Sequence, residues 1–134
     1  MSAPYKFSPK GQARLATAHK DLQQLFNEII QHTDCAILEG HRDQATQDLY
    51  YATGKSKLKW PQGKHCSKPS MAVDVCPCLD GKATFEHSMC VEFGWLVVKK
   101  AEEMGIALRW GGDWDGDGDR SDQNFDDLVH FELR

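Results

Sequence analysis

The sequence contains no long hydrophobic run, no internal repeat and no segment of low complexity. No stretch approaches the roughly 18 consecutive apolar residues that a membrane-spanning helix requires, so we expect no membrane insertion. The first twelve residues lack the apolar segment of a secretory signal peptide, which predicts synthesis in the cytoplasm and an export route that the chain does not encode. With 134 residues, 40% hydrophobic and 27% charged, the composition is that of one globular domain over residues 1–134.

Cysteine pairs with the spacing of zinc knuckles or redox enzymes are also absent. The five cysteines are an odd number, and only Cys76 and Cys78 stand close together, as C-x-C rather than C-x-x-C. In a chain made in the cytoplasm this favours reduced, mostly buried thiols over a disulfide framework. A structural zinc on Cys76 and Cys78 would lack a second pair of ligands. A thiol hydrolase using Cys66 beside His65 is disfavoured because the side chains of adjacent residues diverge.

A concentrated basic patch is missing as well. The net charge is −4, yet residues 113–127 alone carry seven aspartates and one arginine, a net −6, which leaves the remainder at +2. A nucleic-acid-binding surface needs clustered basic residues, so we expect no nucleic-acid partner. The concentrated acidic segment indicates a local cation site instead.

Hydrophobic periodicity predicts interleaved helices and strands. Ser8-Pro9 is a typical helix start, Gly105 stands where a C-terminal cap glycine belongs, and Pro77 is expected to close a strand. The expected helices span 9–32, 43–52 and 85–104, and the expected strands span 35–38, 71–75, 106–110 and 128–133, with loops at 55–69 and 111–127. Because the last strands lie close together in the sequence, this order predicts an α+β fold with a mostly antiparallel sheet.

Three residues have the chemistry of a catalytic metal site. His65 ends the long loop, Asp74 interrupts an otherwise apolar strand, and His130 lies in the last strand. A catalytic zinc typically has three ligands of these types and keeps a fourth position for water. Spacing alone does not separate such a site from ordinary hydrogen-bonded histidines. Glu132, two residues after His130, is expected on the same face of the strand, where it can orient a metal-bound histidine.

Four segments resemble the motifs of a zinc peptidase family, in the family's order. Lys64–Asp74 resembles the first metal motif as K-H-x-x-x-P-S-x-A-V-D, and Asp127–Leu133 resembles the second as D-x-x-H-x-E-L. Gly40-His41-Arg42, with Gln44 and Gln47, resembles the family's G-x-R segment, and Arg109–Trp114 resembles the stretch before the second motif. The family comprises the D-alanyl-D-alanine carboxypeptidases and L-alanyl-D-glutamate endopeptidases of peptidoglycan, including phage endolysins. The resemblance extends from about residue 37 to the end of the chain.

This resemblance implies a fold and a set of site residues. The fold would be hedgehog/DD-peptidase-like, with helices flanking a central antiparallel sheet. A zinc ion would be held by His65, Asp74 and His130. Asp127 would act as the general base, and Arg42 would stabilise the negative charge that develops on the carbonyl oxygen.

The resemblance also implies a substrate, the stem peptide of peptidoglycan, and therefore action on the bacterial cell wall. Small members without a signal peptide resemble the phage L-alanyl-D-glutamate endopeptidases, which makes that activity the leading hypothesis. A D-alanyl-D-alanine carboxypeptidase and a non-catalytic zinc-binding module of the same fold are the alternatives. Asp127 and Arg42 favour an enzyme, because a binding module needs no base beside its metal, although Arg42 could instead form a surface ion pair with Glu39 or Asp43. Nothing in the sequence indicates an obligate oligomer, so we expect a monomer.

The acidic loop matches the first half of an EF-hand calcium loop. Asp113, Asp115 and Asp117 fall at positions 1, 3 and 5, a glycine falls at position 6, and Asp119 adds another carboxylate. Position 12 is Asn124 rather than the usual glutamate, and the flanking segments are predicted strands rather than helices. A calcium site and a solvated acidic turn both stay open as interpretations. Bound calcium would order the strand that follows the loop.

Overall fold

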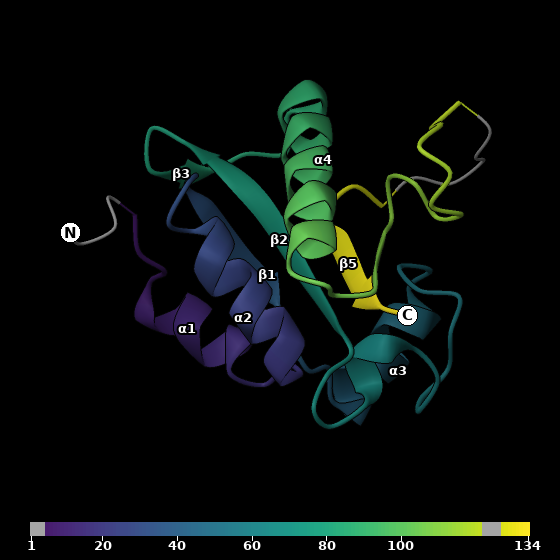
Figure 1. The fold of residues 1–134 in the computed structure, drawn as a ribbon. Coiled ribbons are helices and arrows are strands. Elements are labelled where there is room, and N and C mark those ends of the chain that lie inside the picture. Colours follow the sequence, from purple (N-terminus) through teal and green to yellow (C-terminus); the bar gives the residue numbers. More distant parts are fainter. Residues whose placement is uncertain (1–4, 122–126) are drawn as a thin grey trace.

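The computed structural model describes residues 5–121 and 127–134, and Figure 1 shows how they are arranged. The helices are α1 (Pro9–Leu15), α2 (Lys20–Ile29), α3 (Gln44–Ala52) and α4 (His87–Glu103), with a short 3-10 helix η1 (Lys64–Cys66). The strands are β1 (Cys35–Glu39), β2 (Ala72–Leu79), β3 (Lys82–Ala83), β4 (Leu108–Trp110) and β5 (His130–Leu133). None of the helices in these two ranges has the length and apolarity that a membrane crossing requires. The predicted α+β class is confirmed.

The sheet is antiparallel, with strand order β1-β2-β5-β4, and β3 forms a hairpin with the end of β2. In the register of the two central strands, Asp74 of β2 lies opposite His130 of β5, and Ala72 lies opposite Glu132. Directly opposed residues of an antiparallel pair point to the same face, and residues two apart on one strand do so as well. The register therefore gathers Asp74, His130 and Glu132 on one face of the sheet.

The other face of the sheet carries the hydrophobic core. Phe131 of β5 is fully buried, with edge-to-face contacts to Phe26 of α2 (ring centroids 5.5 Å apart) and to Phe93 of α4 (6.1 Å). In Figure 1, α2 and α4 lie side by side over this part of the sheet, and the two helices are in contact. Truncating a buried phenylalanine of this kind costs about 3–5 kcal/mol. The core thus holds β2 and β5 in the register on which the opposite face depends.

The segment predicted as one helix over 9–32 is two helices, separated at residues 16–19. At the break the backbone pairs with the residue that leads into β2: Ser70 N donates to Thr17 O (2.9 Å), and His19 N donates to Ser70 O (2.8 Å). His19 then caps α2 through its side chain. The prediction of a continuous helix was wrong because the apolar periodicity runs across the break, whereas these long-range backbone bonds leave no periodic pattern in the sequence.

Further boundaries differ from the prediction. Strand β4 begins at Leu108 rather than at residue 106, and β5 begins at His130 rather than at residue 128. The strand predicted to close at Pro77 continues through it, because Cys78 N donates to Asp34 O on the β1 side (3.0 Å) and Thr84 N, just after β3, donates to Pro77 O (2.9 Å). Helix α4 begins at His87 rather than at Phe85, which is 67% exposed. None of these changes moves Asp74, His130 or Glu132 from the face of the sheet that they share.

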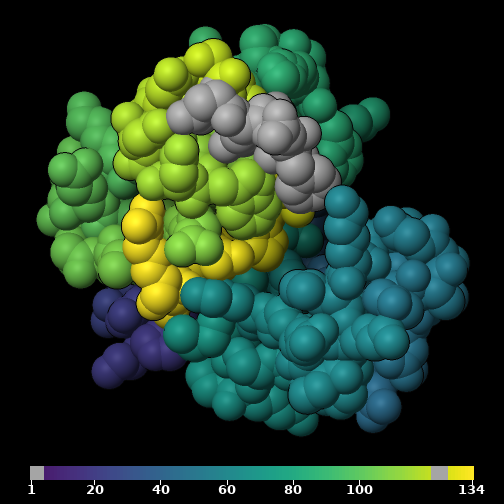
Figure 2. Space-filling view, turned by 90° about the vertical axis from the view of Figure 1, so that its right-hand side faces the viewer, coloured from purple at the N-terminus to yellow at the C-terminus, as the bar shows by residue number. Residues whose placement is uncertain are grey.

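The long loop predicted at 55–69 is present, and it carries η1. Its far end is tied to two other segments, because Arg42 N donates to His65 O (2.7 Å) and Met71 N donates to Lys64 O (2.8 Å). In Figure 2 the teal loop and α3 form one lobe, the lime-coloured segment that follows β4 forms another, and the surface is hollowed between them. This arrangement leaves the face of the sheet that carries Asp74, His130 and Glu132 accessible from one side.

Candidate metal centre

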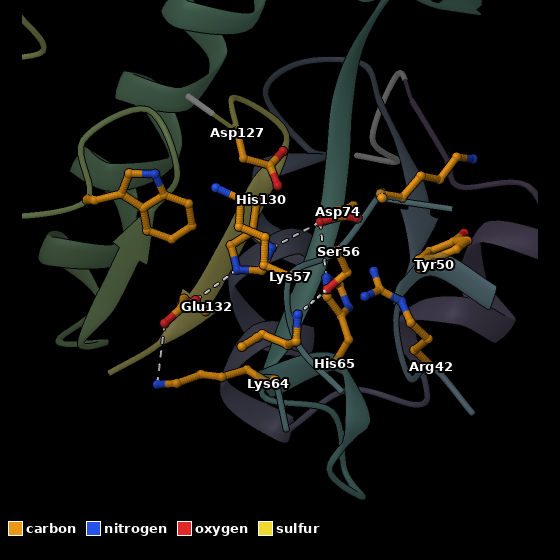
Figure 3. A pocket seen from close by; sticks show the side chains of 15 residues that line it. Arg42, Tyr50, Ser56, Lys57, Lys64, His65, Asp74, Asp127, His130 and Glu132 are labelled. Atoms are coloured by element: carbon orange, nitrogen blue, oxygen red, sulfur yellow. Dashed lines mark hydrogen bonds and ion pairs between the residues drawn. The ribbon is translucent and has the colours of Figure 1, made fainter. Parts of the chain in front are cut away.

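A cleft of about 570 Å³ opens over the face of the sheet that carries Asp74 and His130. One wall consists of α3, η1 and the loop between them. The other consists of β5 together with Trp114 and Asp127, which stand at the two ends of the acidic loop (Figure 3). The residues that the sequence singles out for the peptidase site all line this one cleft: His65, Asp74, His130, Asp127, Arg42 and Glu132.

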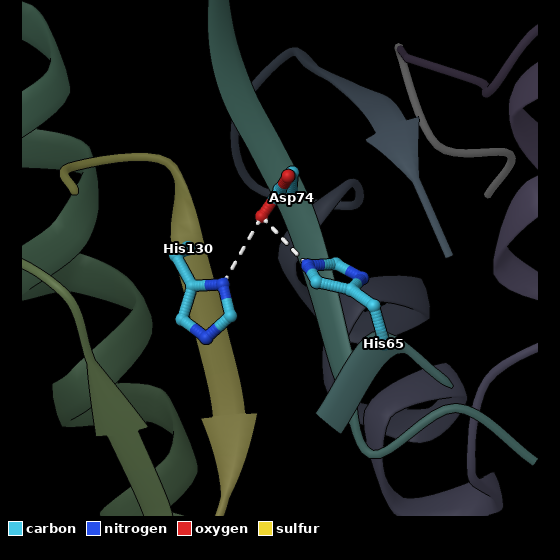
Figure 4. Close-up of side chains that lie close together, drawn as sticks. All are labelled: His65, Asp74 and His130. Carbon is cyan, nitrogen blue, oxygen red and sulfur yellow. Dashed lines mark hydrogen bonds and ion pairs between the residues drawn. The ribbon is translucent and has the colours of Figure 1, made fainter. Parts of the chain in front are cut away.

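Three side chains converge at the floor of the cleft (Figure 4). Asp74 Oδ1 lies 3.1 Å from Nε2 of His65 and 3.3 Å from Nδ1 of His130, and the three donor atoms all fall within 4.8 Å of one another. His65 comes from η1, Asp74 from β2 and His130 from β5, so the fold brings together donors from three separate segments. This His65-Asp74-His130 group can bind a metal ion.

The outer nitrogen of each histidine ring is already bonded to the protein. His65 Nδ1 lies 2.8 Å from the carbonyl oxygen of Gly40, and His130 Nε2 lies 2.9 Å from Oε1 of Glu132. Because a carbonyl and a carboxylate only accept, each outer nitrogen donates. The inner nitrogen donates to Asp74 when its ring is protonated, and it has a lone pair for a metal when the ring is neutral. Such outer partners fix the tautomer and orientation of metal-binding histidines. The residues present therefore fit a metal.

The pKa values of the group follow from its burial and its pairing. Burial disfavours the charged form of Asp74, but hydrogen bonds from His130 and His65 outweigh burial and hold the pKa of Asp74 well below its usual range. Burial also opposes protonation of His130, but its bonds to Asp74 and Glu132 raise the pKa of His130 to about 9. Without a metal, a proton on His130 balances the carboxylates around it. A metal cation would take over that role, so metal and proton compete for this ring.

Asp127 lies at the upper end of the cleft, beside His130 in Figure 3. Its position is fixed by the backbone: Asp127 N donates to Gly111 O (2.9 Å), and Gly111 N donates to His130 O (2.9 Å). A Cβ atom on Gly111 would lie 2.1 Å from the carbonyl oxygen of Asp127, so only glycine permits this approach. Burial raises the pKa of Asp127, and the negative charge of Asp74 raises it further. The arrangement provides a carboxylate with increased proton affinity beside the metal group.

The guanidinium of Arg42 is held on the opposite wall. It forms an ion pair with Glu39, donates to Oε1 of Gln47 (2.9 Å), and lies over the ring of Tyr50 at 4.7 Å from its centroid. The pairing with Glu39 that the sequence left open is therefore present, while Asp43 instead caps α3. The ion pair with Glu39 does not remove Arg42 from the cleft, because the paired guanidinium still lines the cavity and Glu39 fixes its orientation.

Gln47, which the sequence resemblance groups with the G-x-R segment without giving it a role, is a member of this network. Its side chain is 1% exposed; Oε1 accepts from Arg42, and Nε2 donates to Ser56 Oγ (3.0 Å) and to Leu58 O (2.6 Å). One buried amide thus orients Arg42 and anchors the loop that forms the cleft wall. A glutamine on the inward side of a predicted helix is the sequence feature that could have pointed to it.

Glu132 connects the metal group to cations at the rim. Its carboxylate accepts from His130 and forms ion pairs with Lys64 (3.5 Å) and Arg109 (3.9 Å), and these partners outweigh burial to lower the pKa of Glu132. The ring of Trp114 lies over the same histidine at 5.5 Å between centroids. The predicted orienting role of Glu132 has the required hydrogen bond.

The acidic loop also brings carboxylates together. Asp113, Asp115 and Asp117 offer oxygen atoms within 4.8 Å of one another, whereas the carboxylate of Asp119 accepts from Ser121 N (2.9 Å) and is not part of that group. Asp113 is 5% exposed, and its Oδ1 is buried with no hydrogen-bond partner among the residues that the structure describes. Burial and the neighbouring carboxylates raise the pKa of Asp113. Position 12 of the calcium motif, residue 124, lies outside the described residues.

All five cysteines are free in the structure, and four of them are buried. Burial raises the pKa of the Cys66 thiol, and Cys66 Sγ faces Gln47 at 3.7 Å. A thiol activated for nucleophilic attack needs a lowered pKa, so Cys66 lacks the character of a nucleophile.

Comparison with known proteins agrees with this geometry. The chain is 32% identical over 126 residues to the L-alanyl-D-glutamate peptidase of Escherichia phage T5, covering 89% of this chain and 88% of the relative. The fold matches the crystal structure of the L-Ala D-Glu endopeptidase ChiX of Serratia marcescens, with a TM-score of 0.78, 23% sequence identity, and coverage of 98% of this chain and 92% of that one. The family model of the phage L-alanyl-D-glutamate peptidases matches residues 1–134. The chain therefore belongs to the phage L-alanyl-D-glutamate peptidase family.

Proposed function

We propose that this protein is a zinc-dependent L-alanyl-D-glutamate endopeptidase that cuts the stem peptides of peptidoglycan, as a phage-type endolysin acting on the bacterial cell wall. Membership of the family supports the peptidase activity and the peptidoglycan substrate. One domain, residues 1–134, would carry the whole activity as a monomer. The observation that carries the metal part is the convergence of His65 Nε2, Asp74 Oδ1 and His130 Nδ1 on the floor of an open cleft.

The donor set favours zinc among the common metals. Two imidazole nitrogens and one carboxylate oxygen are typical ligands of a catalytic zinc ion, whereas magnesium and calcium prefer oxygen ligands alone. His65, Asp74 and His130 would hold the ion, with Gly40 and Glu132 orienting the two rings. Bound zinc lowers the pKa of a coordinated water and polarises the carbonyl group of the substrate.

Asp127 is the proposed general base. Its carboxylate would accept a proton from the attacking water and then deliver that proton to the amide nitrogen of the departing D-glutamate. A carboxylate with an ordinary pKa holds a proton too weakly for this relay, and the burial of Asp127 increases its proton affinity. The backbone pairing with Gly111 keeps Asp127 in place between the two transfers.

Arg42 is the proposed stabiliser of the charge that develops on the carbonyl oxygen. A fixed guanidinium needs no reorientation as that charge forms, which is the source of its catalytic effect. Glu39 and Gln47 provide the fixation, and of these three residues only Arg42 lines the cleft.

The experiment is a digest of purified peptidoglycan by the zinc-loaded protein, with mass spectrometry of the products and Asp127→Asn as the inactive control. New N-terminal D-glutamate is the expected product. Release of free D-alanine would instead identify a D-alanyl-D-alanine carboxypeptidase. No product from a protein with a full zinc content would overturn the enzymatic function and favour a zinc-binding module.

We further propose that the acidic loop binds calcium through Asp113, Asp115 and Asp117. The buried Oδ1 of Asp113 without a partner supports this proposal, because a cation would supply the interaction that the protein does not. Three close carboxylates repel one another unless a cation neutralises them. The loop leads toward Asp127 and His130, so calcium would stabilise the strand that carries part of the metal centre.

A further inference from the structure

The charges in the cleft are separated onto two sides. Three carboxylates lie on one side: Asp74 comes from β2, Asp127 from the segment just before β5, and Glu132 from β5. The cations come from the facing wall, which runs from the start of α3 to η1: Arg42, Lys55, Lys57 and Lys64. A substrate that spans the cleft therefore meets a cationic wall on one side and the metal centre on the other.

Three of the four wall cations already have partners. Arg42 is paired with Glu39, Lys64 is paired with Glu132, and Lys55 lies over the ring of Tyr50 at 5.2 Å. Lys57 lines the cleft and is exposed, and it has no hydrogen bond, ion pair or ring contact among the residues that the structure describes. Lys57 is thus the cation of this wall that remains available for a ligand (Figure 3).

The backbone that carries Lys57 is fixed on both sides. Gln47 Nε2 donates to the side chain of Ser56 and to the carbonyl oxygen of Leu58, and Leu58 N donates to Ser56 Oγ (3.1 Å). Gln47 is itself buried in the α3 wall. Lys57 therefore projects from a short loop whose position is set by the same amide that orients Arg42, and it lines the cleft that contains His65, Asp74 and His130.

The proposed substrate supplies an anion on the leaving side. A glutamate residue has two carboxyl groups, and a peptide chain can continue through only one of them. The glutamate whose nitrogen departs therefore keeps a free carboxylate, whichever linkage follows it. Ammonium–carboxylate pairing is the simplest way for a cleft to recognise this feature, which a neutral residue at the same place lacks.

We infer that Lys57 forms a carboxylate subsite that recognises the free carboxyl group of the glutamate on the leaving side of the cut. This inference rests on the proposed endopeptidase function. The loop at residues 56–58 then contributes to substrate specificity. Gln47 positions this loop relative to Arg42 through its hydrogen bonds to both. A wall that selects glutamate in this way discriminates against stem peptides in which the same carboxyl group is amidated.

The test compares two synthetic substrates, an L-Ala-D-Glu stem peptide with the free carboxylate and the same peptide with that group as a carboxamide. Each is cleaved by the zinc-loaded wild type, by Lys57→Gln, by Lys57→Arg, and by Lys20→Gln as a control of equal charge change on the exposed surface of α2. All assays share one ionic strength, because screening alters unpaired surface charges.

We expect wild type to prefer the acid over the amide by about tenfold in kcat/KM, the size of a charge-assisted hydrogen bond. Lys57→Gln should lose that preference mainly through KM, Lys57→Arg should retain most of it, and Lys20→Gln should match wild type. Equal cleavage of both substrates by wild type, or an equal loss in Lys57→Gln and Lys20→Gln, would overturn the subsite. Cleavage of neither substrate by wild type would overturn the endopeptidase function instead.

Discussion

The described residues include two clusters of side chains whose donor atoms converge as a metal ion requires, and the two are built in opposite ways. The His65-Asp74-His130 group is assembled from η1, β2 and β5, and its outer atoms are bonded to the backbone or to Glu132. The acidic loop is held by local bonds, in which Asp115, Asp117 and Asp119 each accept from a backbone N–H two residues ahead. Asp113 accepts from Gly118 N (2.9 Å). One cluster is a product of the fold, and the other is a product of a short sequence.

The two clusters also differ in how they balance charge without a metal. The metal centre combines carboxylates with imidazole rings, and one proton on His130 compensates for much of the negative charge. The acidic loop contains carboxylates only in its converging group, and Asp113 responds with a raised pKa. We therefore expect the metal centre to keep its geometry when the metal is removed, and the loop to depend on its cation.

The largest expected effect follows from removing the carboxylate shared by both histidines. Asp74→Asn should lose the metal and all detectable peptidase activity, because an amide oxygen is a poor replacement for an anionic zinc ligand. The double variant Asp115→Asn/Asp117→Asn should keep a full equivalent of zinc, since the two clusters share no ligand. Metal analysis by mass spectrometry and circular dichroism would check both. Zinc retained in Asp74→Asn would contradict the ligand assignment.

A smaller effect should separate catalysis from metal binding within the centre. Asp127→Asn should lower kcat by about 10²–10⁴-fold while zinc content and KM change little, because the variant removes the proton acceptor and keeps the shape of the side chain. The measurement is steady-state cleavage of a stem peptide together with zinc analysis of the same sample. A parallel loss of zinc would mean that Asp127 is a ligand rather than the base.

The sequence predicts the metal centre better than its surroundings, for physical reasons. His65, Asp74 and His130 stand in motifs because a metal requires particular donor types at particular distances. The network that orients Arg42 is different, since any buried acceptor at the position of Gln47 can serve, and only the packed structure shows which one does. The same holds for the helix break at 16–19, where long-range backbone bonds override a periodic pattern.

A pH dependence should distinguish the metal-free centre from the loaded one. The pKa of His130 is raised from 6.5 to about 9 in the folded state, so its protonation stabilises the fold fully below pH 6.5 and that contribution is lost as the pH rises through about 9. We expect the melting temperature of the metal-free protein to fall by several degrees over this interval. The metal-loaded protein should lack this fall, because the metal replaces the proton.

Calorimetric melting at a series of pH values, with the metal-free His130→Gln variant as control, would check this expectation. The variant has no titrating ring at this position and should show a flatter profile between pH 6.5 and 9. A wild-type profile as flat as that of the variant would mean that the proton on His130 contributes nothing to stability.

The smallest effect should come from calcium, and it would decide whether the acidic loop is a second metal site. At fixed zinc, calcium at about a tenfold excess over its dissociation constant would stabilise the protein by about 1.4 kcal/mol. The melting temperature should therefore rise by a few degrees in wild type and in Asp48→Asn, whose exposed carboxylate lies on α3. It should not rise in Asp115→Asn/Asp117→Asn. Equal shifts in all three proteins would reduce the loop to a solvated acidic turn, because they would show that calcium acts on general surface charge rather than on the converging carboxylates.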